Sequence, residues 1–118
     1  MKATYTSGIR SQSGFTLIEI MIVVAIIGLL ATMAIPNLMK SRKDTQRAVC
    51  IQNLKSINGA KEVWALQERK GDADVPADAD LFGTNKAIKD RPNCPAGGTY
   101  DLKAVSERAT CSVADHTY

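Results

Sequence analysis

The sequence has few of the residues from which an active site or a metal centre is built. It has one histidine, His116, and its three cysteines, Cys50, Cys94 and Cys111, form no C-x-x-C pair. It has no phosphate-binding glycine loop, no nucleophile beside a base and no paired carboxylates in an apolar setting. These absences predict a protein that is not an enzyme. We expect no cofactor, and the single histidine leaves no recognisable zinc set.

The sequence also lacks a strong excess of charge of one sign. The net charge is +3, and two of the 15 basic residues, Lys2 and Arg10, lie near the N-terminus. Nucleic-acid binding usually needs a clustered basic face, so we expect no nucleic-acid partner. The densest basic group, Lys40, Arg42 and Lys43, follows an apolar run. It is better explained as an anchor at phospholipid headgroups than as a ligand site.

One long apolar run dominates the first third of the chain. No charged residue occurs from Ile20 to Met39, and about 20 apolar helical residues span a ~30 Å hydrocarbon core. We therefore predict a membrane helix. Gly28 and Pro36 are its weak points: Pro36 favours a kink, whereas Gly28 is equally consistent with a loosened segment or with an ordinary membrane-helix residue.

Glu19 helps to decide what this apolar run is for, because a carboxylate in an apolar segment needs a reason. A conventional secretory signal would use the basic Lys2 and Arg10 and a late cleavage site after Ala34. A buried carboxylate is costly without a partner, however, and neither that signal nor a plain membrane anchor benefits from Glu19. A free amine close to Glu19 would explain it.

Residues 13–19, SGFTLIE, supply that amine if the chain is cut after the glycine. The segment resembles the class III signal of type IV pilins, type II secretion pseudopilins and competence pseudopilins. The resemblance implies that a prepilin peptidase cuts between Gly14 and Phe15 and methylates Phe15. It makes Glu19 the fifth mature residue, whose natural partner is the Phe15 amine of a neighbouring subunit. Members of the family also carry a glycine and a proline at the offsets of Gly28 and Pro36.

The remaining sequence predicts an α+β fold of the type IV pilin kind. We expect a cleaved leader at 1–14, a transmembrane and filament-core helix at 15–39, an amphipathic second half of that helix at 40–70, and a small β-containing head at 71–118. Apolar residues at helical spacing, interrupted by one lysine, predict the face that packs on the head: Cys50, Leu54, Ile57, Lys61 and Trp64.

An acidic linker, residues 71–83, follows the helix. Its four aspartates, Asp72, Asp74, Asp78 and Asp80, raise the alternative of a calcium loop, but their spacing does not match an EF-hand. We favour a solvated turn in which Asp78 or Asp80 caps a short helix. We therefore predict no metal site here.

Alternating residues at 99–105 and 108–113 predict an antiparallel hairpin that packs Tyr100, Leu102 and Val113 on the helix. So small a head needs a covalent staple. A Cys94–Cys111 disulfide would close a loop of about 18 residues and stabilise it by ~3 kcal/mol, leaving Cys50 as a buried thiol. Pairing of Cys50 with either of the other two is the alternative.

The chain is thus predicted to be a structural filament subunit. We expect it in the bacterial inner membrane before assembly and in an extracytoplasmic or cell-surface filament afterwards. Its expected partners are prepilin peptidase, copies of itself and other pilins or pseudopilins. The alternative is a membrane-anchored extracytoplasmic domain that stays monomeric. The sequence leaves open whether the filament belongs to a pilus, a secretion system or a DNA-uptake machine.

Overall fold

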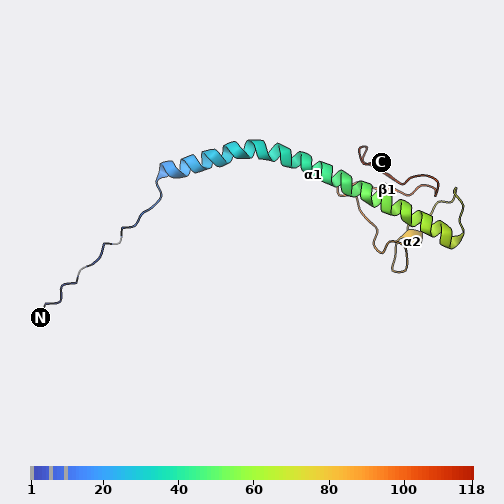
Figure 1. The fold of residues 1–118 in the computed structure, drawn as a ribbon, viewed down its shortest axis with the longest axis horizontal. Coiled ribbons are helices and arrows are strands. Elements are labelled where there is room, and N and C mark those ends of the chain that lie inside the picture. The colour runs from blue at the N-terminus through green and yellow to red at the C-terminus, as the bar shows by residue number, and fades with distance from the viewer. Residues whose placement is uncertain (1, 6, 10) are drawn as a thin grey trace. The chain divides into compact units, whose positions relative to one another are not determined.

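The computed structural model describes residues 2–5, 7–9 and 11–118. Its elements are a long helix α1 (Leu17–Glu68), a short helix α2 (Asp78–Leu81) and two strands, β1 (Tyr100–Asp101) and β2 (Thr110–Cys111) (Figure 1). The predicted α+β class, with one long N-terminal helix and a small antiparallel sheet, is confirmed. The chain divides into two compact units, Met1–Asn37 and Leu38–Tyr118.

The first unit consists of the N-terminal segment and the apolar part of α1. The segment before Thr16 forms no helix or strand where the structure describes it, and Met1, Thr6 and Arg10 of the predicted leader lie outside the described residues. From Leu17 onward the apolar side chains face outward, and α1 is long and apolar enough to cross a membrane. Pro36 lies inside the helix without ending it, so a kink there stays a prediction.

The helix ends at Glu68, two residues before the predicted bound at residue 70. Arg69 adopts the left-handed conformation with a φ of 51°, and the Lys70 N–H donates to the Ala65 carbonyl at 2.9 Å. This is the hydrogen-bond pattern of a Schellman motif, which normally uses glycine at the left-handed position. An arginine therefore occupies the position where the sequence would favour a glycine.

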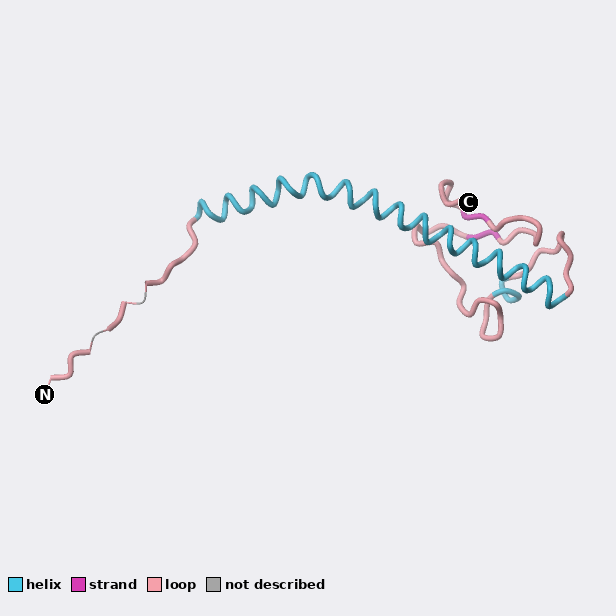
Figure 2. Tube along the Cα trace, viewed as in Figure 1, coloured by secondary structure: helices cyan, strands magenta, loops and turns pink. Residues whose placement is uncertain are grey.

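The second unit packs its loops around the C-terminal half of α1 (Figure 2). The predicted stripe is confirmed, because all five of its members are buried. Residues from the loops, α2 and the strands complete the core: Leu81, Cys94, Tyr100, Leu102 and Ala109, with Val113 partly buried against them. The predicted packing of the hairpin on the helix is therefore confirmed.

The hairpin itself is shorter than the alternating pattern suggested. Tyr100 pairs with Cys111 and Asp101 with Thr110 in antiparallel register. Lys103 takes a positive φ of 56°, which takes the backbone out of the extended conformation directly after Leu102. The tip of the hairpin is held instead by the loop that follows α1. The N–H groups of Val105 and Ser106 donate to the carbonyls of Asp74 and Asp72 in that loop.

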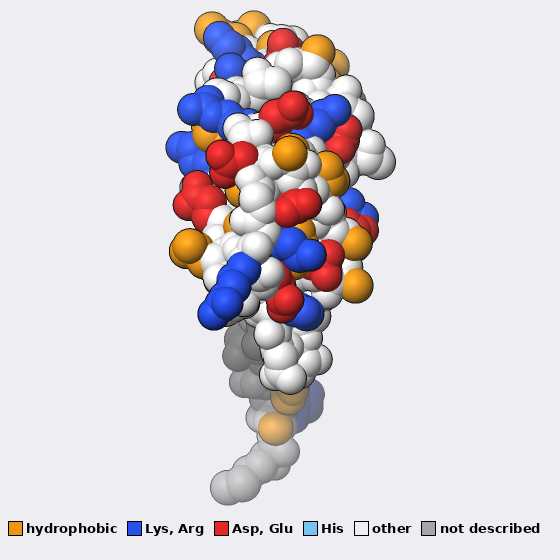
Figure 3. Space-filling view, turned by 90° about the vertical axis from the view of Figure 1, so that its right-hand side faces the viewer, with side chains coloured by type: hydrophobic (Ala, Val, Ile, Leu, Met, Phe, Trp, Pro, Cys, Tyr) orange, Lys and Arg blue, Asp and Glu red, His pale blue; other side chains and the backbone are white. Residues whose placement is uncertain are grey.

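The exposed face of the head carries charges of both signs. Figure 3 shows Lys and Arg side chains interspersed with Asp and Glu side chains on this face. One ion pair joins Arg91 to Asp78 at 2.8 Å, and another joins Lys103 to Asp101 at the same distance. Exposed pairs of this kind add little stability, about 0–1 kcal/mol each.

Candidate functional sites: the helix start and the cysteine–histidine cluster

Thr16 and Glu19 hold each other at the start of α1. The Thr16 N–H donates to the Glu19 carboxylate at 2.9 Å, and the Glu19 N–H donates to the Thr16 hydroxyl oxygen at 3.3 Å. This reciprocal pair is a capping box, which satisfies two of the amide donors that a helix start leaves free. Sequence reasoning missed this role of Glu19, although the Thr-x-x-Glu spacing before an apolar run is its known signature.

The predicted processing junction lies immediately before this cap. Gly14 and Phe15 are outside the helix, and the Phe15 side chain is 87% exposed. A Cβ added at Gly14 would meet no atom within 4 Å. Cleavage at this junction and pairing of Glu19 with a neighbouring amine stay predictions.

Gly28 and Pro36 both lie within α1. Gly28 has open space around it and Pro36 is exposed on the helix surface. The predicted loosening of the segment between them concerns assembled subunits and stays a prediction.

The acidic linker uses its carboxylates separately. Asp74 accepts the Gly71 N–H at 2.7 Å, and Asp80 accepts the Ala77 N–H at 2.8 Å at the start of α2. The predicted short helix is present, but its N-cap is Ala77 rather than an aspartate: Asp80 accepts the N-cap amide from the third helical position, and Asp78 pairs with Arg91. These contacts are those of an acidic turn, and calcium binding stays untested.

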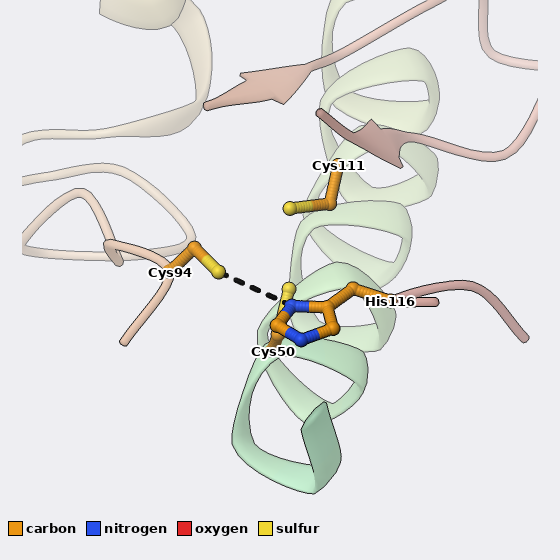
Figure 4. Close-up of side chains that lie close together, drawn as sticks. All are labelled: Cys50, Cys94, Cys111 and His116. Carbon is orange, nitrogen blue, oxygen red and sulfur yellow. Dashed lines mark hydrogen bonds between the residues drawn. The ribbon is translucent and has the colours of Figure 1, made fainter. Parts of the chain in front are cut away.

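A second candidate site lies in the head, where Cys50, Cys94, Cys111 and His116 meet (Figure 4). Cys50 comes from α1, Cys94 from the loop before β1, Cys111 from β2 and His116 from the C-terminal segment. Their sulfur and ring-nitrogen atoms all lie within 4.8 Å of one another. His116 is the third residue from the end of the sequence, yet it is only 5% exposed.

The three thiols are free in the part of the chain that the structure describes. Every pair of sulfurs lies within 4.8 Å, so all three pairings remain candidates. The Cys94–Cys111 disulfide therefore stays a prediction. Spacing along the sequence could not have revealed this cluster, since its members are scattered from position 50 to position 116.

The pKa values of two of these thiols are shifted in opposite directions. Burial raises the pKa of the Cys50 thiol to about 12. Burial acts in the same direction on Cys94, but the N–H groups of Ala96 and Gly98 stabilise its thiolate, and with Cys50 and His116 they bring its pKa down to about 7. The Cys94 Sγ lies 3.3 Å from the His116 Nδ1.

The structure combines a capped helix, whose apolar side chains face outward, with a small α+β head. Proteins of this class need lipid or other helices to cover that apolar surface. Comparison with known proteins identifies the class. Residues 9–35 match the family described as "Prokaryotic N-terminal methylation motif". No solved structure matches the chain significantly.

Relatives, two of them matched over most of this chain, agree with this match. The type II secretion system core protein G of Klebsiella michiganensis is 30% identical over 116 residues, covering 88% of this chain and 82% of the relative. The type IV wide pilus major component PilA4 of Thermus thermophilus is 31% identical, covering 92% and 76%. The core protein G of Pseudomonas aeruginosa is 42% identical over a shorter stretch, covering 48% and 40%. The chain belongs to the family of type IV pilins and type II secretion pseudopilins.

Proposed function

We propose that this chain is a structural subunit of a type IV pilus-like or type II secretion-like filament. Prepilin peptidase cuts it between Gly14 and Phe15 and methylates Phe15. Residues 15–39 anchor the mature subunit in the inner membrane, and the same helix then packs into the filament core. The head, residues 71–118, lies outside the cytoplasm. Relatives of both filament kinds are similar over most of this chain, so the proposal covers both.

One observation carries this proposal: the residues that the structure describes leave the apolar half of α1 uncovered. Leu17 is 80% exposed, Leu29 is 68% exposed and Met33 is 76% exposed. Burying such side chains is worth roughly 1.5–3 kcal/mol each, so this surface would not persist in water. Lipid covers it before assembly, and the helices of neighbouring subunits cover it in a filament.

The relatives' names support a structural role. They describe a secretion-system core protein and a pilus component rather than an enzyme. A subunit of this kind needs no catalytic residue, because assembly relies on packing and on the charges at the helix start. Glu19 accordingly acts on a neighbouring subunit's Phe15 amine and takes no part in catalysis.

The decisive experiment is the mass and N-terminal sequence of the full chain extracted from membranes, with and without a co-expressed prepilin peptidase. We expect the peptidase to yield a chain that begins at methylated Phe15. Gly14→Val should block this cut by placing a branched side chain at the junction. Gly8→Val, in the same leader and equally open, should be processed normally.

Two results would overturn the processing proposal. A chain beginning at Ile35 would mean conventional signal cleavage, and an uncut chain in the presence of the peptidase would mean a permanent anchor. Chemical cross-linking of the processed chain then tests assembly. Ladders of cross-linked copies support a filament, and a processed chain that stays monomeric supports the anchored-domain alternative.

A further inference from the structure

The four side chains of the cysteine–histidine cluster have the spacing of a metal site before any metal is considered. Tetrahedral zinc has Zn–S bonds of about 2.3 Å and Zn–N bonds of about 2.0–2.1 Å, which separate neighbouring sulfurs by about 3.8 Å and sulfur from nitrogen by about 3.6 Å. The four donor atoms lie within 4.8 Å of one another, and the Cys94 Sγ to His116 Nδ1 distance is 3.3 Å. Side-chain rotations that shorten the longest of these separations by up to about 1 Å would complete the tetrahedron.

The donors are also of the right kind and in the right surroundings. Three thiolates and one imidazole form one of the common closed ligand sets of structural zinc. Cys50 is fully buried, and Cys94 and His116 are each 5% exposed. Soft sulfur ligands in an enclosed site favour zinc over calcium or magnesium, which prefer oxygen.

Neighbouring residues hold the segments that carry the ligands. Tyr100 packs in the same buried cluster as Cys50 and Cys94. Its hydroxyl is positioned by Asn53, whose side-chain amide donates to it at 3.0 Å. Such outer contacts orient metal ligands and strengthen metal binding.

Gly98 shows how closely the backbone wraps the cluster. A Cβ at this position would lie 2.7 Å from the Cys111 sulfur and 2.9 Å from the Val113 side chain. Only a residue without a side chain allows the turn after Cys94 to approach Cys111 in this way.

A disulfide explains less of this arrangement than a metal does. Any disulfide uses two sulfurs, about 2.05 Å apart, and leaves one thiol and a buried imidazole without a role. A metal uses all four groups. It also joins four separate segments of a small head, and metals commonly stabilise domains whose apolar core is too small.

The surroundings fit the charge of such a centre. Three thiolates and one Zn²⁺ leave a single negative charge, which nearby cations stabilise. His116 lines a surface depression in which basic residues outnumber acidic ones: Lys40, Lys43, Arg47, Asp44 and Asp115.

We propose that Cys50, Cys94, Cys111 and His116 form a structural zinc site that clamps the head onto α1. On binding, Zn²⁺ displaces the thiol protons to solvent and bonds to three sulfurs and to the His116 Nδ1. The site is independent of the N-terminal processing and assembly chemistry, so its test does not depend on whether filaments form.

The test uses the full chain, purified in detergent under reducing conditions and stripped with a chelator. Elemental analysis after addition of Zn²⁺ should give one zinc per chain, and the three thiols should become protected from a thiol reagent. Co²⁺ should produce the intense visible absorption of a tetrahedral thiolate site. Absence of binding, or binding that leaves all three thiols reactive, overturns the proposal.

Variants decide which groups bind the ion. His116→Ala should weaken Co²⁺ binding at least tenfold, whereas His116→Cys should keep the tetrahedral spectrum with stronger thiolate character. Asp90→Asn, at an exposed position outside that depression, should bind like the wild type. If His116→Ala does not fold, the His116→Cys spectrum still decides, and an octahedral spectrum in that variant counts against the site.

The chain isolated from cells supplies the last comparison. Zinc that copurifies with three reduced cysteines supports the site in its natural compartment. A disulfide between any two of the three in a nonreducing peptide map, with no zinc present, overturns it and restores the disulfide prediction.

Discussion

Lys61 is the residue least expected in the core of the head. Its side chain is 1% exposed and lies in the apolar stripe of α1. The ammonium group does not extend to solvent: it donates to the Leu102 carbonyl at 2.7 Å and to the Glu107 carbonyl. Lys61 therefore fixes the hairpin to the helix through two backbone oxygens on either side of the hairpin's turn.

Replacing Lys61 by methionine tests this role. Lys61→Met keeps an unbranched apolar chain but leaves the Leu102 carbonyl buried without its donor, at a cost of about 1–3 kcal/mol. Relief of ammonium desolvation offsets part of this cost, so we expect a net loss of about 1–2 kcal/mol. Urea unfolding in detergent, followed by the fluorescence of buried Trp64, measures this loss of stability.

The control is Lys55→Met, which removes an exposed ammonium near the Tyr118 ring and should cost under about 1 kcal/mol. Equal or greater stability of Lys61→Met would mean that desolvation outweighs the two hydrogen bonds.

The pH dependence of the same pair of proteins gives an independent test. Burial lowers the pKa of the Lys61 ammonium below its ordinary value, against the opposing charges of Glu107 and Asp101. Between the lowered and the ordinary lysine pKa, the unfolded chain holds a proton that the folded chain releases, so the stability contributed by Lys61 rises with pH there. The wild type should therefore gain stability relative to Lys61→Met as the pH rises toward the ordinary lysine pKa of about 10.4. A difference that stays constant or shrinks would contradict the lowered pKa.

Gly98 in the head and Gly59 in α1 should respond in opposite ways to substitution by alanine. Gly98→Ala forces a methyl group to within 2.7 Å of the Cys111 sulfur, and we expect a loss of about 1–3 kcal/mol. Gly59 lies exposed within α1, and a Cβ there meets nothing within 4 Å. Gly59→Ala should therefore raise stability by about 0.5–1 kcal/mol, because alanine favours helix. Trp64 fluorescence during unfolding measures both, and a stabilised Gly98→Ala would contradict the close packing around the cluster.

At the scale of elements, the left-handed residue that ends α1 lies two positions before the glycine that the sequence offers for that role. Glycine normally takes the left-handed position after a helix, but here Arg69 takes it and Gly71 does not, since Gly71 has no positive φ. Arg69→Gly should raise stability by about 0.5–1 kcal/mol by removing the strain of a side chain in that conformation. Gly71→Ala should change it by less than about 0.5 kcal/mol, since the nearest atom to its Cβ is a carboxylate oxygen at 3.8 Å. The opposite order in thermal unfolding would place the cap at Gly71.

The elements also show which features the sequence could predict. The stripe from Cys50 to Trp64 was predictable because helical periodicity is local and repeats every three or four residues. The two-residue strands were not, because the left-handed Lys103 interrupts an otherwise alternating pattern. The cysteine–histidine cluster was beyond prediction for a different reason. Its four members come from four segments that only the tertiary fold brings together, and none of the usual short ligand spacings is present.

At the scale of the whole molecule, Glu19 belongs to the isolated chain and, in our proposal, to the filament. In the single chain one carboxylate oxygen accepts the Thr16 N–H. The other oxygen can accept a neighbouring subunit's Phe15 amine at the same time, so capping and pairing are compatible. In the apolar interior of a filament an unpaired member of such an ion pair costs about 3–5 kcal/mol, which is larger than the ~1 kcal/mol of a helix cap. The pairing should therefore dominate assembly.

Three substitutions separate the two roles. Glu19→Gln keeps a side chain that completes a capping box but removes the charge, Glu19→Ala removes both, and Thr16→Val removes only the hydroxyl acceptor. We expect both Glu19 variants to be processed to Phe15 yet to form no filaments, whereas Thr16→Val should assemble. Mass spectrometry of the processed chain and cross-linking of assembled copies give the two readouts. If Glu19→Gln assembles as the wild type does, the cap and not the charge is what the filament requires, because the amide can hold the helix start but cannot balance an amine buried among apolar helices.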